Sequence, residues 1–270
     1  MMGKTKEINS LQNPLVKQLV QLKAKSRERR NLGLFVLEGL RELALAIKGD
    51  YHIKTILYFE GIISKGTVLQ LLKDANSQPE LIEVSNAVYE KIAYRGSTEG
   101  VVALVRAKSH TLKDLSPLKA NTLVLVAEAP EKPGNIGALL RTADAANLDA
   151  VLIANPKGDL YNPNIIRSSV GCIFTNNIAV ASSTDIIDFL KQRKINIFCA
   201  ALSASNEYTK TDFTHASAIV VGTESTGLSM EWLNASSQNI IIPMEGEIDS
   251  MNVSVSAAIL IFEAKRQRAL

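Results

Sequence analysis

Residues 240–268 read IIIPMEGEIDSMNVSVSAAILIFEAKRQR, and the rest of the chain is organised around this stretch. It begins with a β-branched run that predicts a buried strand, which ends at Pro243. A glycine-containing loop follows, and either Ser250 or Asn252 is suited to cap the next helix. That helix has apolar residues near helical spacing and ends in basic residues, as its dipole favours. The stretch therefore predicts a strand, a loop and a C-terminal helix.

Length and composition are those of a globular protein. The chain has 270 residues, 46% of them hydrophobic and 21% charged, which is enough for two modest domains. The two cysteines and three histidines are scattered without ligand spacing, so we expect no metal. The N-terminus lacks the apolar core of a signal peptide, and no apolar run reaches the roughly 20 residues of a membrane helix. These features predict a soluble cytoplasmic protein with no membrane segment.

Positive charge is concentrated at the N-terminus. Residues 1–32 contain eight basic and two acidic residues, a balance of 8 − 2 = +6, against +3 for the whole chain. A basic arm is a common footprint for nucleic acid, although such a run is more often a solvated helix face. Both interpretations stay open at this point.

Strand and helix patterns alternate along the chain, which predicts an α/β fold. Residues 1–106 form the first predicted domain, with a basic helix at residues 9–30 and strands at residues 34–37, 53–59, 81–84 and 101–106. Residues 107–120 are polar and aperiodic, and form the predicted linker. Residues 121–270 form the second domain, with strands at residues 122–127, 150–153, 178–181, 195–200, 219–221 and 239–242. Their near-continuous apolar runs predict a parallel sheet covered on both faces.

Three loops follow expected strand ends, where open α/β sheets bind ligands. The first, at residues 128–147, contains Asn135 as a helix-cap candidate and Arg141 about one turn into the helix. The second, VVGTESTGLS at residues 220–229, is a Gly-rich turn that matches neither the P-loop nor the dinucleotide fingerprint. The third, at residues 242–252, has the pattern IPMxGxxxSxN. Spacing alone is a weak signal for each loop.

Together, and in this order, the loops resemble the three motifs of the SpoU (TrmH-like) branch of the SPOUT RNA methyltransferases. The matching residues are Asn135, Gly137 and Arg141, then Gly222, Glu224 and Gly227, then residues 242–253, IPMEGEIDSMNV. This resemblance covers residues 121–270, with Met251 in place of the usual leucine and Asn147 in place of the usual glycine. Residues 1–106 more loosely resemble the RNA-binding substrate module often attached to this branch, through FVLEGLREL (35–43) and YRGSTEGVVALV (94–105).

The resemblance implies a ribose 2′-O-methyltransferase that uses S-adenosylmethionine, with a deep trefoil knot in its second domain. The implied active-site residues are Asn135, Arg141, Glu224, Ser250 and Asn252. Backbone contacts with the cofactor would fall on Gly222, Ile242 and Met251. Members of the family are typically homodimers with the active site at the subunit interface. Ribosomal RNA is the favoured substrate over transfer RNA, because the chain has a separate N-terminal module.

The reaction itself needs an aligned ribose hydroxyl and a way to remove its proton. No histidine lies in any motif, so the usual base at neutral pH is missing. Arg141 is the candidate in the family, yet a guanidinium is normally protonated, with a pKa above about 12. Two roles stay open: a transient base, and a cation that stabilises the developing alkoxide. We favour the second on energetic grounds.

Other functions are compatible with parts of the pattern. A transfer RNA 2′-O-methyltransferase is one alternative, and a non-catalytic RNA-binding or ribosome-assembly protein with the same fold is another. A non-catalytic relative would be expected to have replaced Arg141 or Asn252, and both are present. The missing fingerprint disfavours a nicotinamide or nucleotide enzyme. The Asn135 and Arg141 motif disfavours a base-methylating relative.

Overall fold

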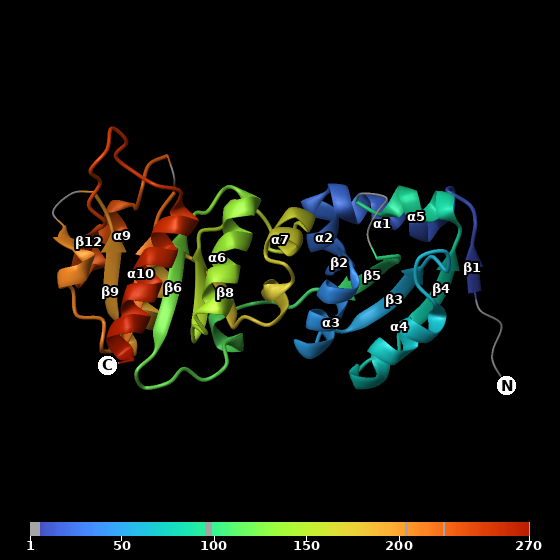
Figure 1. The fold of residues 1–270 in the computed structure, drawn as a ribbon, viewed down its shortest axis with the longest axis horizontal. Helices are drawn as coiled ribbons and strands as arrows, with labels where there is room; N and C mark the ends of the chain where they lie inside the picture. The colour runs from blue at the N-terminus through green and yellow to red at the C-terminus, as the bar shows by residue number, and fades with distance from the viewer. Residues whose placement is uncertain (1–5, 95–98, 203–204, 224, 270) are drawn as a thin grey trace. The chain divides into compact units, whose positions relative to one another are not determined.

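The computed structural model describes residues 6–94, 99–202, 205–223 and 225–269. The chain forms two compact units (Figure 1). Unit 1 consists of Met1–Lys108 and Asp159–Thr175, and unit 2 of Ser109–Gly158 and Asn176–Leu270. Each unit has its own sheet and its own core.

Unit 1 contains a five-stranded mixed sheet of order β1-β4-β3-β5-β2. β5 runs antiparallel to both β2 and β3, and the other pairs are parallel. The strands are β1 (Lys6–Ile8), β2 (Leu34–Glu38), β3 (Ile53–Tyr58), β4 (Glu80–Val84) and β5 (Val101–Arg106). The predicted α/β character of this part of the chain is confirmed.

The helices of unit 1 are α1 (Pro14–Ala24), α2 (Ser26–Leu32), α3 (Leu40–Lys48), α4 (Lys65–Leu71), α5 (Asn86–Ile92) and α7 (Pro163–Ser168). The single helix expected over residues 9–30 is wrong. Lys25 adopts an extended conformation, with φ −121° and ψ 114°, and separates α1 from α2. α1 buries Val16, Leu19 and Leu22 against α5 and β2.

The segment 159–175 is held within unit 1 by aromatic and ionic contacts. The ring of Tyr161 stacks on Phe35 with centroids 4.2 Å apart, and Phe174 meets Tyr51 edge-on at 5.1 Å. Asp159 also forms a buried ion pair with Arg29, whose Nη2 lies 2.6 Å from Oδ2. Unit 1 is therefore assembled from two separate parts of the sequence.

Unit 2 contains a seven-stranded sheet of order β10-β12-β9-β11-β6-β7-β8, in which every pair is parallel. Its strands are β6 (Leu123–Glu128), β7 (Ala150–Ala154), β8 (Ile178–Ala181), β9 (Asn196–Ala200), β10 (Asn206–Glu207), β11 (Ser217–Val221) and β12 (Gln238–Ile241). The central strands β6, β7 and β11 are buried along their whole length. The predicted parallel sheet is confirmed.

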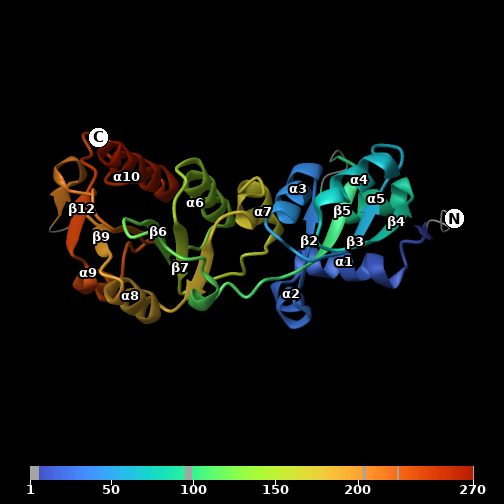
Figure 2. The same cartoon turned by 90° about the horizontal axis from the view of Figure 1, so that it is seen from below.

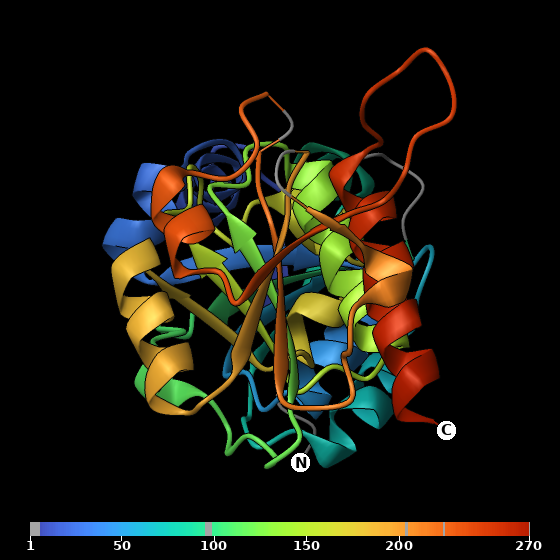
Figure 3. The same ribbon diagram turned by 90° about the vertical axis from the view of Figure 1, so that its left-hand side faces the viewer.

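The main helices of unit 2 are α6 (Pro133–Ala145), α8 (Ser183–Gln192), α9 (Met230–Ala235) and α10 (Val253–Arg268). Figure 2 shows α6 and α10 on one face of this sheet, with α8 and α9 on the other. The long loop between β12 and α10 extends beyond the sheet (Figure 3). Within the described ranges, no helix combines the length and apolarity needed to cross a membrane.

Candidate functional site

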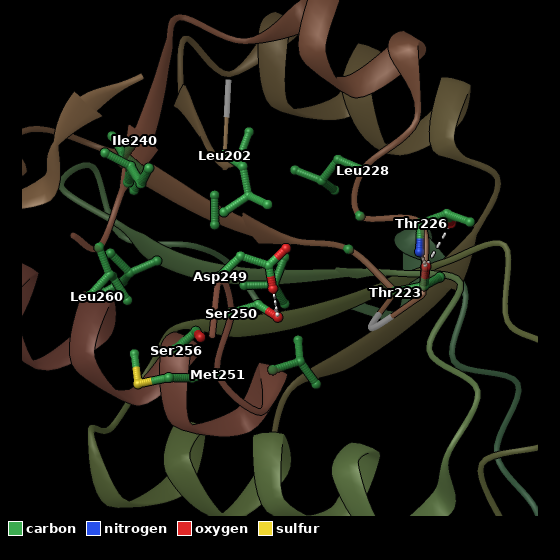
Figure 4. Close-up of a pocket in the computed structure, with 18 of the residues that line it drawn as sticks. Leu202, Thr223, Thr226, Leu228, Ile240, Asp249, Ser250, Met251, Ser256 and Leu260 are labelled. Atoms are coloured by element: carbon green, nitrogen blue, oxygen red, sulfur yellow. Dashed lines mark hydrogen bonds between the residues drawn. The ribbon is translucent and has the colours of Figure 1, made fainter. Parts of the chain in front are cut away.

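A pocket of about 510 Å³ lies at the carboxyl ends of β9, β11 and β12. This is the edge at which parallel sheets bind ligands, and the volume lies within the range of small-molecule sites. Figure 4 shows its lining, which comes from these strand ends, from the two loops that follow β11 and β12, and from the start of α10. Leu202, Leu228, Ile240 and Leu260 make much of this surface apolar.

The second motif forms a tight turn beside the pocket. Thr223 and Gly227 exchange two backbone hydrogen bonds, each of 3.1 Å. A Cβ atom on Gly222 would lie only 2.3 Å from the carbonyl carbon of Gly227, so the turn itself requires glycine there. Gly222 lines the pocket, and Glu224 lies outside the described residues.

The third motif supplies further lining and the start of α10. Ile242, Ser250 and Met251 line the pocket. Asn252 is the cap of α10, since its Oδ1 accepts the Ser254 backbone N–H at 3.0 Å. Of the two cap candidates in the sequence, Asn252 is therefore the one used.

The first motif begins differently from the expectation. α6 starts at Pro133 with Lys132 before it, so Asn135 lies inside the first turn and the prediction of a cap there is wrong. Asn135 Oδ1 instead accepts a hydrogen bond of 3.2 Å from Asn252 Nδ2. Its own Nδ2 is buried without a hydrogen-bond partner among the described residues. The structure thus brings the first and third motifs together.

Arg141 lies apart from these residues. It is exposed on α6, it does not line the pocket, and it forms no hydrogen bond or ion pair with any described residue. It lies six positions after Asn135, which at about 100° per residue turns the two side chains toward different sides of the helix. The arginine is therefore an accessible cation.

A buried carboxylate that the sequence interpretation passed over holds the second motif. Glu128, the last residue of β6, is 6% exposed, and its Oε2 accepts the Ser229 backbone N–H at 2.8 Å. Ser183 Oγ lies 3.5 Å from Glu128 Oε1 and accepts the Trp232 indole N–H at 2.9 Å. In the sequence, Glu128 is a carboxylate at the end of an otherwise apolar strand. Because a buried charge needs hydrogen-bond partners, this position could have indicated a polar network.

Two further observations concern cysteine and possible metal ligands. Burial raises the pKa of the Cys199 thiol, in β9 and outside the pocket lining, to about 11, so this thiol stays protonated at neutral pH. Among the described residues, no group of three or more His, Cys, Asp or Glu side chains is arranged to hold a metal ion.

Comparison with known proteins gives two family matches and several structural relatives. Residues 122–262 match the SpoU rRNA Methylase family, and residues 13–103 match the MRM3-like substrate binding domain. The chain is 28% identical to the 23S rRNA (guanosine(2553)-2′-O)-methyltransferase RlmP of Bacillus subtilis, over 96% of this chain and 99% of that protein.

Among the solved structures similar to this chain, two illustrate a likeness over nearly its whole length. A crystal structure of an RNA 2′-O ribose methyltransferase is 38% identical, with a TM-score of 0.82 over 98% of this chain and 100% of that one. The AdoMet-bound rRNA methyltransferase of Sinorhizobium meliloti is 27% identical, with a TM-score of 0.89 over 98% of each chain. Because the first family match spans more than half of the sequence and contains all three motif loops, the chain belongs to the SpoU rRNA Methylase family.

Proposed function

We infer that this protein transfers a methyl group from S-adenosylmethionine to the 2′-hydroxyl of a ribose in RNA. The observation that carries this function is the pocket at the carboxyl edge of the parallel sheet, lined by loops of the second and third SpoU motifs. The whole-chain likeness to a 2′-O ribose methyltransferase and to an AdoMet-bound relative supports the same reaction. When bound, S-adenosylmethionine supplies a methyl group already activated by its sulfonium.

The pocket residues fit this cofactor. Gly222 brings backbone without a side chain to the pocket lining, and apolar side chains such as Leu228 and Leu260 offer contact for the base and the aliphatic carbons of the cofactor. We assign the cofactor contacts to Gly222, Ile242 and Met251. All three line the pocket, which supports the assignment.

We propose that Asn135, Arg141, Glu224, Ser250 and Asn252 form the active site. The Asn135–Asn252 hydrogen bond supports an orienting role for this pair, which does not itself line the pocket, whereas Ser250 does. Arg141 is exposed and unpaired in the described structure, as suits a cation that receives an RNA phosphate and stabilises the developing alkoxide. For Glu224 we propose that its carboxylate anchors the site by accepting hydrogen bonds.

We further propose a homodimer whose active site is shared, with a trefoil knot in the second domain. α10 supports the dimer because it is apolar on two sides: Ala257, Leu260 and Ile261 are buried, whereas Val255 and Phe262 are 47% and 50% exposed. Val255 and Phe262 are seven residues apart and therefore lie on one side of the helix, where a partner could cover them. A cytoplasmic location remains a prediction.

Ribosomal RNA is the proposed substrate, in line with the 23S rRNA activity named for the Bacillus subtilis relative. The test is to map 2′-O-methylation across total RNA from cells with and without the gene. A methylated ribosomal nucleotide that disappears with the gene, and returns when purified protein and S-adenosylmethionine are added, is the expected result. A site in transfer RNA would change the substrate, and no change at any nucleotide would contradict the function.

A further inference from the structure

Among the described residues of the proposed active site, none is an evident acceptor for the ribose proton; Glu224 lies outside them. A guanidinium is normally protonated, and the side chains of Asn135, Ser250 and Asn252 are amides and a hydroxyl, which are poor bases at neutral pH. With Arg141 in the role of a fixed cation, another group takes the proton.

Asp249 is the single ionisable side chain among the described residues that line the pocket. Figure 4 shows its carboxylate in the midst of the labelled lining side chains, with Ser250 beside it. Ser250 Oγ donates a hydrogen bond of 3.3 Å to Asp249 Oδ1. Two more acids on the same loop, Glu245 and Glu247, are exposed and are not part of the lining. Glu224, on the neighbouring loop, lies outside the described residues.

We propose that Asp249 is the final proton acceptor of methyl transfer and that the Ser250 hydroxyl relays the proton to it. This inference rests on the proposed function. The ribose oxygen forms the new bond to the methyl carbon, and the sulfur–methyl bond breaks with its electron pair left on sulfur. The ribose proton passes to Ser250 Oγ, whose own proton passes to Asp249 Oδ1. The aspartate ends protonated and returns its proton to solvent after the product leaves.

The arrangement gives Ser250 a chemical task that its hydroxyl alone cannot perform. A hydroxyl is both a donor and an acceptor, so it can pass on a proton only if a second group receives one. Aspartate carboxylates accept protons from substrate hydroxyls in other group-transfer enzymes, such as protein kinases. Asp249 is exposed, so its protonated form can exchange with solvent between turnovers.

The proposal differs from arginine base catalysis in its pH dependence. With a carboxylate as acceptor, the logarithm of kcat is flat between about pH 6 and about pH 9. With a neutral arginine as acceptor, kcat rises about tenfold per pH unit over the same range, because the fraction of arginine that is neutral rises about tenfold per pH unit.

The test compares Asp249→Asn with Glu247→Gln, an exposed carboxylate on the same loop that does not line the pocket. Asp249→Asn keeps an oxygen for the Ser250 hydrogen bond and removes the acceptor. We expect its kcat to fall at least about 100-fold and to rise with pH, while Kd for cofactor and RNA, measured by calorimetry, stays within about threefold. Ser250→Ala should behave like Asp249→Asn, and Glu247→Gln like the wild type.

Three outcomes would overturn the proposal. The first is an unchanged kcat in Asp249→Asn. The second is weaker cofactor binding in Asp249→Asn with kcat retained, which would make Asp249 a cofactor ligand. The third is a wild-type kcat that rises tenfold per pH unit. Retained cofactor binding in the variant also shows that it is folded. Failure of the proposed function is a separate result, because the wild-type protein would then methylate no RNA.

Discussion

Asn252 Nδ2 donates a hydrogen bond of 3.2 Å to Oδ1 of Asn135, a residue 117 positions earlier in the chain. The Oδ1 atom of the same Asn252 side chain accepts the Ser254 backbone N–H at 3.0 Å and so caps α10. One amide thus fixes the start of α10 and connects it to the first turn of α6. The two functions can be separated by mutation, because the cap needs only an oxygen and the connection needs the N–H.

Asn252→Ser should keep the cap and remove the connection to α6, since serine is also a good N-cap. We expect its Tm to stay near the wild-type value and its turnover to fall at least about tenfold, because misplaced groups lose alignment. Asn252→Ala should remove both and cost about 1 kcal/mol of stability in addition. Asn135→Ala removes the same hydrogen bond from the other side and leaves the cap intact. We expect it to have normal stability and the same lowered turnover as Asn252→Ser. Full turnover in Asn135→Ala would contradict a role for this hydrogen bond.

Gly222→Ala tests the turn beside the pocket. The added Cβ would lie 2.3 Å from backbone atoms of Gly227, so the turn must open and the cofactor should bind at least about tenfold more weakly. Gly246→Ala is the matched control, because a Cβ there meets nothing within 4 Å. Calorimetric titration with S-adenosylmethionine measures both. Equal affinity in the two variants would remove Gly222 from the cofactor site.

The ion pair of Arg29 and Asp159 should matter for the stability of unit 1. The two side chains are 5% and 11% exposed, and Arg29 Nη1 also donates to the Leu22 carbonyl at 2.5 Å. Asp159→Ala leaves a buried cation without its partner, so we expect a loss of about 3–5 kcal/mol in urea unfolding. Glu80→Gln breaks the exposed Lys6–Glu80 pair, 58% and 50% exposed, and should cost at most about 1 kcal/mol. Similar losses in both variants would refute this ranking.

The strands were largely predictable because burial selects continuous apolar, β-branched runs. β3, β5, β7 and β8 lie within one or two residues of their expected limits. β1 and β10 were missed since strands of three and two residues at a sheet edge leave no periodic signal. The helix break at Lys25 was missed because the leucine pattern continues up to it and neither glycine nor proline marks it.

The sequence indicated which loops belong to the candidate site, but it did not indicate most of the contacts between them. Spacing could indicate neither the Asn135–Asn252 hydrogen bond nor the network around Glu128, because each joins residues distant in sequence. Asp249 occupies a variable position of the pattern IPMxGxxxSxN, so the family pattern did not indicate it. The turn at Gly222 is glycine for a steric reason that only coordinates reveal.

The basic residues at positions 23–30 divide into two groups. Arg29 is buried in its ion pair, and Lys23 donates to the Ile92 carbonyl at 2.6 Å, with burial lowering the pKa of its amine. Lys25, Arg27 and Arg30 are exposed. Replacing these three by glutamine should lower the salt slope of RNA binding by roughly 0.7 for each phosphate that is no longer neutralised, if the bound strand is single.

The control for this prediction is a pair of exposed lysines in unit 2, Lys191→Gln and Lys194→Gln. Filter binding at several salt concentrations gives both slopes, and cofactor affinity should not change. An unaltered slope in the N-terminal variant would make this run a solvated helix face.

The last prediction concerns which subunit supplies Arg141. In the proposed two-fold dimer, Arg141 of one chain serves the cofactor pocket of its partner, and both composite sites are equivalent. One chain carrying Arg141→Ala and another carrying Gly222→Val, whose larger side chain cannot fit beside the Gly227 backbone, are each expected to be inactive alone. In a mixed dimer, one site inherits both changes, while the other receives an intact arginine and an intact pocket. Random pairing makes about half of the dimers mixed, so mixing should restore roughly a quarter of wild-type turnover.

Phe262→Glu, added to both chains, is the control. It places a charge on the exposed apolar side of α10, where the partner is proposed to pack, and should prevent pairing and rescue together. Sedimentation measures the pairing, and mass spectrometry verifies that dimers are mixed. If verified mixed dimers stay inactive, then Arg141 and the pocket it serves belong to the same chain, because every site in the mixture would carry one of the two changes.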